Sequence, residues 1–106
     1  MAWIILVAAG ILEVCWAFAT KLSDGFTRLG PSALSIVTMI ASVGLLSIAM
    51  KTLPLGTAYM VWTGIGAVGA FVAGVVFLGE ALTPARVLAA LLIVAGLGLM
   101  KLSSSA

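Results

Sequence analysis

Glu13 is an acidic side chain in the middle of a long apolar stretch, which makes it the first candidate for chemistry in this sequence. An acid at the centre of a membrane helix costs about 2.5–3.5 kcal/mol on insertion scales, so it is a candidate functional residue by default. Burial favours the neutral form of a carboxyl group, and such a group can hold either a proton or a cation. The alternative is that a neutral Glu13 only hydrogen-bonds a neighbouring helix.

The residues around Glu13 leave space beside its carboxyl group. Steps of three and four residues place five side chains on one helical stripe. Gly10 and Ala17 are small, and Trp16 lies one turn after Glu13. The small residues indicate either a ligand pocket or close packing of a second helix. The stripe consists of Leu6, Gly10, Glu13, Ala17 and Thr20.

Two further groups carry hydrogen-bonding side chains. Ser35, Thr38 and Ser42 share a helical face, and Ser42 is the deepest of them. Buried hydroxyls usually bond the carbonyl one turn back, which is the structural alternative to a ligand role. Tyr59 and Trp62 are three residues apart and therefore lie on one side of a helix. Their rings favour a cation, although Tyr59 is also placed as an interfacial anchor.

The run from Gly64 to Gly69 spells GxGxxG. A dinucleotide site requires a strand before this motif, and here apolar helical residues precede it, so that interpretation fails. Glycines in an apolar helix indicate a bend or a close packing face. A bend in this run would suit a protein that opens to alternate sides of a membrane.

The composition excludes a water-soluble domain. Of the 106 residues, 64% are hydrophobic and 8% are charged, against roughly 25% charged in soluble domains. The chain has no His and a single cysteine, Cys15, which argues against a metal site and excludes a disulfide within one chain. The small positive charge comes from scattered loop residues, so a nucleic-acid partner is not expected, and no motif indicates a cofactor.

Four apolar runs predict an all-α integral membrane protein with one transmembrane domain over residues 1–106. Each run has about the ~20 residues needed to cross the hydrocarbon core. The connections between runs are short, and a frayed tail is expected after the last one. The predicted spans are about residues 2–20, 31–50, 57–78 and 84–100.

The charges give a weak orientation signal. With four spans, both termini and the loop at Lys51 face one side of the membrane. Lys51 and Lys101 then oppose Lys21, Arg28 and Arg86, a margin of one in the count that sets topology. We therefore expect insertion in both orientations and an antiparallel pair, which would place a Glu13 on each side of a shared cavity. The alternative is a single topology with a weak signal.

Together these features resemble the small multidrug resistance family of proton-coupled exporters over nearly the whole chain. The matching segments are GILEVCWAFATKLSDGFTRL, KTLPLGTAYMVWTGIGAVGAFVAGVVFLGE and ALLIVAGLGLMKL. The WTGIGAVG and KTLPLGTAY versions resemble the guanidinium-exporter branch. Ala89 stands where some relatives have glycine, which leaves the tightness of the dimer contact open.

The resemblance implies a transporter and not an enzyme, in a bacterial inner membrane, working as an antiparallel dual-topology homodimer that exchanges guanidinium for protons. It makes Glu13 the shared carboxylate for proton and substrate, and Gly64 and Gly66 the helix kink. Three alternatives remain: a broader exporter of hydrophobic or quaternary ammonium cations, a non-transporting assembly subunit, and a passive cation channel. The expected pocket or carboxylate-orienting residues are Gly10, Trp16, Ser42, Tyr59 and Trp62.

Overall fold

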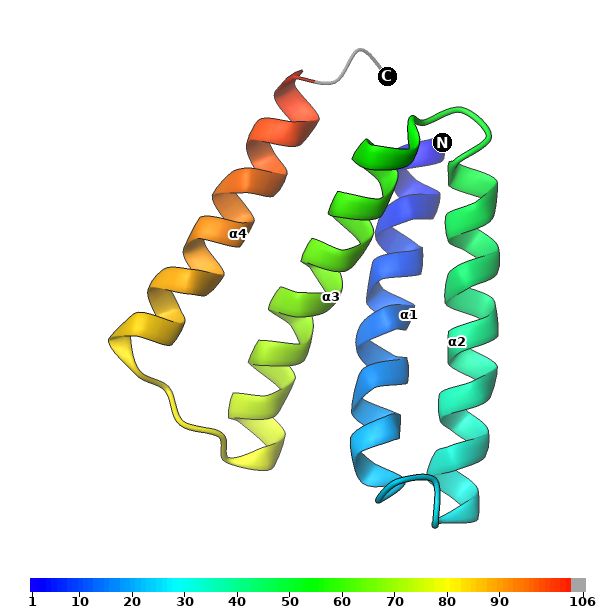
Figure 1. The fold of residues 1–106 in the computed structure, drawn as a ribbon, viewed down its shortest axis with the longest axis vertical. Helices are drawn as coiled ribbons and strands as arrows, with labels where there is room; N and C mark the ends of the chain where they lie inside the picture. Colours follow the sequence, from blue (N-terminus) through cyan, green and yellow to red (C-terminus); the bar gives the residue numbers. More distant parts are fainter. Residues whose placement is uncertain (104–106) are drawn as a thin grey trace.

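The computed structural model describes residues 1–103, and these residues form four α-helices joined by short connections (Figure 1). All four helices are long and apolar enough to cross a membrane, which confirms the predicted all-α membrane fold. The expected tail falls mainly on residues 104–106, outside the described part. The helices are α1 (Ala2–Leu22), α2 (Leu29–Ala49), α3 (Leu55–Leu78) and α4 (Pro84–Ser103).

The helices form one layer and not a closed bundle. Figure 1 shows the order α4, α3, α1, α2 across the layer, with the N-terminus and the last turn of α4 at the same end as the α2–α3 connection. The backbone of α1 packs against α2 and α3, whereas the backbone of α4 approaches only that of α3 among the described residues. The Cα atoms span 43 × 34 × 16 Å. A layer this thin cannot enclose a ligand on all sides.

The helices extend beyond the apolar runs that predict them. α2 begins at Leu29, two residues before the predicted start, and includes Pro31 in its first turn. Proline fits there because the first amide groups of a helix have no partner within it. α3 likewise begins at Leu55, and α1 and α4 end at Leu22 and Ser103, past the predicted ends at residues 20 and 100. Apolar runs mark the hydrocarbon-crossing part of a helix, and the hydrogen-bonded helix continues into the polar margin.

The connection between α3 and α4 has a defined stop and start signal. Gly79 ends α3 in the left-handed region with φ of 68°, and the Glu80 amide donates to the Gly74 carbonyl at 3.1 Å. Glycine is favoured there because it has no Cβ to clash. The Thr83 hydroxyl then accepts from the Arg86 amide at 3.2 Å and caps the start of α4.

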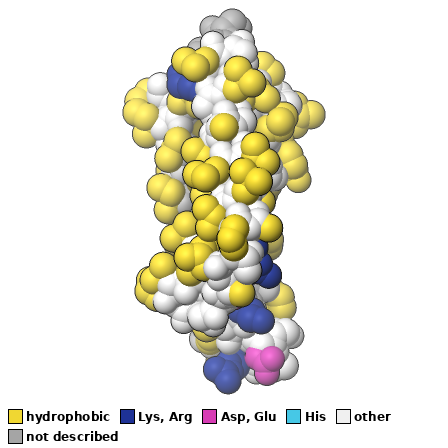
Figure 2. Space-filling view, turned by 90° about the vertical axis from the view of Figure 1, so that its left-hand side faces the viewer, with side chains coloured by type: hydrophobic (Ala, Val, Ile, Leu, Met, Phe, Trp, Pro, Cys, Tyr) yellow, Lys and Arg dark blue, Asp and Glu magenta, His cyan; other side chains and the backbone are white. Residues whose placement is uncertain are grey.

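The buried core is small and lies where α1, α2 and α3 meet. It is built from leucine, valine and alanine side chains. None of the residues of α4 is buried. Figure 2 shows hydrophobic side chains along the α4 side of the molecule, with Lys and Arg toward its two ends, as expected for a surface that faces lipid. The core residues are Leu6, Ala9, Leu46, Ala49, Leu53, Ala58 and Val61.

Candidate functional site

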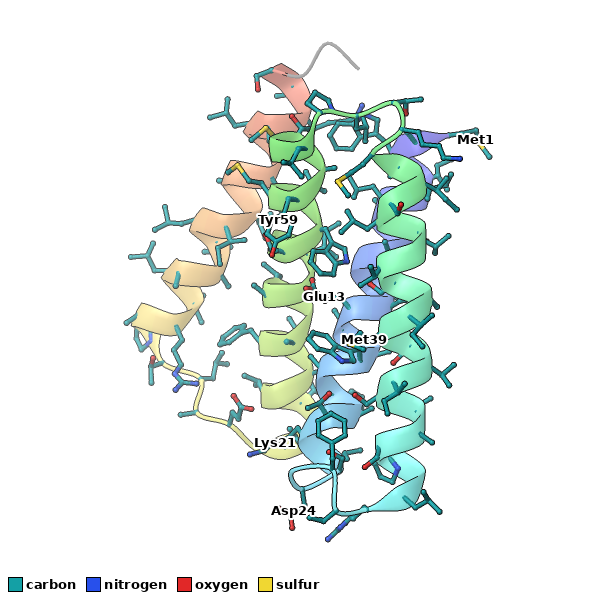
Figure 3. All side chains as sticks on the ribbon, turned by 45° about the vertical axis from the view of Figure 1, so that its right-hand side comes forward. Met1, Glu13, Lys21, Asp24, Met39 and Tyr59 are labelled. Carbon is teal, nitrogen blue, oxygen red and sulfur yellow. The ribbon has the colours of Figure 1, made fainter. Side chains whose placement is uncertain are left out.

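Glu13 lies on α1 and points into the space between α1 and α3 (Figure 3). Its Oε1 atom is buried and has no hydrogen-bond partner within residues 1–103. This oxygen lies directly against Gly66 of α3, where a Cβ atom would overlap Oε1 and Cδ of the carboxyl group. The acid is therefore enclosed on one side by backbone and not by a polar partner.

Glycines bring α1 and α3 close together around the acid. A Cβ on Gly10 of α1 would lie 2.7 Å from Cγ2 of Ile65, which is too close for real Cβ contacts. Gly69 of α3 makes the reciprocal contact with Val14 of α1. Any side chain at these positions would push the helices apart, so we assign Gly10 a packing contact in this structure. It still borders the acid, since it lies one turn before Glu13.

Ser42 connects three helices through one hydroxyl group. Its Oγ donates to the Ala9 carbonyl of α1 at 2.6 Å and accepts from Nε1 of Trp62 on α3 at 3.0 Å. Ser42 is 1% exposed, so both bonds are made away from solvent. Ala9 is also the residue one helical turn before Glu13, so this chain of bonds fixes the backbone that presents the acid.

Tyr59 lies next to Trp62 on α3. The two ring centroids are 5.5 Å apart and the rings are tilted by 59°. Tyr59 is 51% exposed, and Figure 3 shows it on α3 closer to the end of the layer than Glu13. The pair offers an aromatic surface on the open side of the layer, a surface that suits a flat cation.

The structure brings some of the predicted residues together and leaves others apart. Ser42, Trp62 and Tyr59 form one contacting group, and Glu13 and Gly66 form another. Trp16 is half-buried on α1, and its carbonyl accepts the Thr20 hydroxyl at 2.7 Å. No hydrogen bond joins Glu13 to the aromatic residues within residues 1–103.

The two glycines expected to form a kink lie in different surroundings. α3 is helical without interruption from Leu55 to Leu78. Gly66 faces Glu13, whereas Gly64 faces α4, where a Cβ would lie 2.6 Å from Cδ2 of Leu97. Both positions therefore allow close approach of a side chain from another helix, and a bend at them stays a prediction.

Some contacts could not be predicted from residue types. Thr38 follows the usual pattern and donates to the Leu34 carbonyl at 2.8 Å, within its own helix. Ser35 and Ser42 instead bond across to α1, with Ser35 Oγ 2.6 Å from Thr20 Oγ1. The acceptor of Ser42 is a backbone carbonyl, for which no side-chain signal exists. The sequence identifies Gly66 only as one of several glycines in α3, without indicating that it contacts Glu13.

The chemistry available here is binding and proton exchange. The Oε1 atom of Glu13 is buried and has no hydrogen-bond partner within residues 1–103. The Trp62 ring contacts Tyr59, and its hydrogen bond to Ser42 joins α3 to α2. Within residues 1–103 no three His, Cys, Asp or Glu side chains are grouped so as to hold a metal ion. Carboxylates and aromatic faces are both groups that bind organic cations.

Comparison with known proteins gives close relatives over the full length. Residues 1–103 match the family described as Small Multidrug Resistance protein. The chain is 58% identical over 104 residues to proteins named guanidinium exporter from Citrobacter freundii and Salmonella typhimurium, covering 98% of this chain and 99% of each relative. It is 60% identical over 104 residues to a guanidinium exporter of Yersinia pseudotuberculosis, covering 98% of this chain and all of that relative.

Proposed function

The chain belongs to the small multidrug resistance family of multi-pass membrane proteins, and we propose that it exports guanidinium across the bacterial inner membrane in exchange for protons. The proposal is supported by the names of relatives that are 58–60% identical over nearly the whole chain. The structural observation that carries it is Glu13, an acid within a membrane helix whose Oε1 is buried without a partner. Such a group must have its charge neutralised by a proton or by a cation.

Guanidinium suits a carboxylate better than most cations do. Its planar N–H groups donate two parallel hydrogen bonds to the two oxygens of one carboxylate. Its faces are apolar enough to lie on an aromatic ring, and Tyr59 and Trp62 present two rings with centroids 5.5 Å apart. A quaternary ammonium ion has no N–H donor and gains only charge attraction and ring contact.

Competition at Glu13 is the proposed coupling mechanism. A protonated carboxyl group is neutral and cannot form the two charge-assisted bonds that hold guanidinium. A proton arriving from the outside therefore releases the substrate, and loss of that proton on the inside allows the next substrate to bind. The protein changes which side of the membrane the site faces, and no covalent bond of the substrate is altered.

We further propose that two copies form the transport unit in antiparallel orientation. One layer with a Cα thickness of 16 Å leaves Tyr59 51% exposed and Glu13 partly exposed, although an ionised acid must face protein or water. A second copy over this open side would complete a cavity with a Glu13 from each chain. The near balance of two against three basic residues on the two sides supports insertion in both orientations.

Transport by the purified protein tests the substrate. Proteoliposomes that enclose a pH-sensitive dye report proton movement when guanidinium or tetramethylammonium is added outside. We expect protons to leave the interior with guanidinium and far fewer to leave with tetramethylammonium, and none to leave with guanidinium in Glu13→Gln. Equal proton movement with both cations would favour the broader cation exporter that the family description also covers. If no cation moved protons or entered the liposomes, the assembly-subunit alternative would be preferred.

A further inference from the structure

We propose that Gly66 is a positioning residue, whose missing side chain forms a dry seat for Oε1 of protonated Glu13. A guanidinium ion binds with both of its hydrogen bonds only after the carboxylate has left this seat. The inference rests on the proposed function for its substrate, but the seat itself is defined by the contact between these two residues. It gives the competition between proton and substrate a structural basis, namely two positions of one carboxyl group.

The geometry of the contact shows why the position must be glycine. A Cβ atom on Gly66 would overlap Oε1 and Cδ of Glu13 and would lie 2.9 Å from its Cγ. Gly66 is itself buried, so the contact lies inside the α1–α3 interface. Even the smallest side chain at Gly66 would displace the Glu13 carboxyl group. The backbone of α3 is held in its helix, so the carboxyl group is the part of the contact that must move.

The seat suits a neutral carboxyl group. Oε1 is buried in it without a hydrogen-bond partner within residues 1–103, and its neighbour is the backbone of a glycine in a helix. Burying an unpaired charged oxygen costs far more than burying the carbonyl oxygen of a neutral acid. The protonated form therefore occupies the seat, and when the O–H bond breaks and the proton passes to water, the carboxylate moves toward solvent and hydrogen-bond donors.

The seat also blocks substrate. Two parallel N–H···O bonds require both carboxylate oxygens to face the guanidinium ion. With Oε1 against Gly66, one of these oxygens is covered by α3. Guanidinium thus binds the carboxyl group only in its second position, away from Gly66. In the seated position the substrate is excluded sterically, in addition to the loss of negative charge on protonation.

A matched pair of glycine variants tests the proposal. Gly66→Ala fills the seat, whereas Gly69→Ala creates the same kind of conflict between the same two helices, but with Val14 in place of Glu13. Both variants stiffen α3 alike, so an effect of helix flexibility would appear in both. The readout is the pH midpoint of proton release from Glu13, measured by tryptophan fluorescence in detergent with and without guanidinium.

We expect Gly66→Ala to lower the midpoint by about half a pH unit or more, because only the protonated form loses its seat. Half a unit corresponds to roughly threefold tighter apparent guanidinium binding at pH values below the midpoint. Gly69→Ala should leave the midpoint unchanged. Equal shifts in both variants, or none in Gly66→Ala, would overturn the proposal.

A second variant keeps the test valid if Gly66→Ala does not fold. Glu13→Asp shortens the acid by one methylene and withdraws it from the seat, so it should lower the midpoint in the same direction, and an unchanged or raised midpoint would contradict the seat. Where Gly66→Ala folds, combining it with Glu13→Asp should add no further shift, because the seat is already empty in Glu13→Asp. Additive shifts would contradict the seat. If the variants show this pattern of midpoints but the wild-type protein does not bind guanidinium, the proposed substrate is rejected and the proposed seat is retained.

Discussion

The indole Nε1 of Trp62 donates a 3.0 Å hydrogen bond to the hydroxyl group of Ser42, and so joins α3 to α2 in the buried part of the layer. The same hydroxyl donates to the Ala9 carbonyl of α1 at 2.6 Å. One oxygen atom thus fixes the relative positions of three helices one turn away from Glu13.

Replacing Ser42 by alanine should weaken guanidinium binding. Ser42→Ala leaves the Trp62 N–H without its partner and removes the bond to the Ala9 carbonyl. We expect a loss of about 1–2 kcal/mol, or roughly 5- to 30-fold in Kd. Ser47→Ala on the exposed side of α2 is the control and should bind within about twofold of wild type. Equal binding by the two variants, measured by titration calorimetry, would contradict a role for the network.

Trp62→Phe should have a smaller effect than Ser42→Ala. The phenyl ring keeps an aromatic face beside Tyr59, and Ser42 still donates to Ala9. Only the 3.0 Å bond is lost, at a cost of about 0.5–1.5 kcal/mol in the free energy of binding. The same calorimetric titration measures it, and a loss larger than that of Ser42→Ala would mean that the indole contacts the substrate directly.

Gly10→Ala should destabilise the fold. The new methyl group would meet Ile65 at 2.7–2.8 Å, and we expect a decrease of about 1–3 kcal/mol in the free energy of unfolding. Ile65→Ala removes the Cγ2 and Cδ1 atoms that the new methyl group would meet, so it should couple favourably with Gly10→Ala by about 0.5 kcal/mol or more in a double-mutant cycle. Gly44→Ala, where no atom lies within 4 Å of the new Cβ, is the control. Reversible unfolding in mixed detergent measures all four variants, and equal losses at Gly10 and Gly44 would contradict the tight contact.

The four membrane-spanning helices follow from features that the sequence encodes directly. Apolar runs of about twenty residues fix the number of helices, because only a hydrogen-bonded helix can cross lipid. The helix ends differ from the predicted ends by a few residues. For example, α2 begins at Leu29 and not at Pro31, because proline is compatible with the first turn of a helix. Glu13 is the first candidate from the sequence because a charge in hydrocarbon is costly.

The contacts of Glu13 were not predictable in the same way. Gly66 was expected only as part of a kink, since the sequence does not say which glycine of α3 faces α1. Ser42 was expected near the cavity, but its bond to the Ala9 carbonyl depends on the rotation of α2 against α1. Such contacts are set by helix packing, and the small residues that permit it are compatible with several rotations.

Dual insertion predicts that two opposite charge variants complement each other. Lys51→Ala with Lys101→Ala leaves none against three basic residues, and Lys21→Ala with Arg28→Ala and Arg86→Ala leaves two against none. Each set should bias the chain to one orientation, seen with terminal reporter fusions. Guanidinium resistance should be low with either variant alone and restored when both are expressed. Full resistance with a single variant, or a wild-type reporter on only one side, would contradict the antiparallel pair.

Uptake of guanidinium against its own gradient, driven only by a pH step, tests the central claim most directly. Proteoliposomes with an acidic interior are diluted into alkaline buffer that contains labelled guanidinium at the internal concentration. We predict accumulation above the external concentration that collapses when a protonophore is added, and none with Glu13→Gln. Equilibration to equal concentrations regardless of the pH step would indicate a passive channel, and unchanged accumulation by Glu13→Gln would contradict the role of Glu13 as the site shared by proton and substrate.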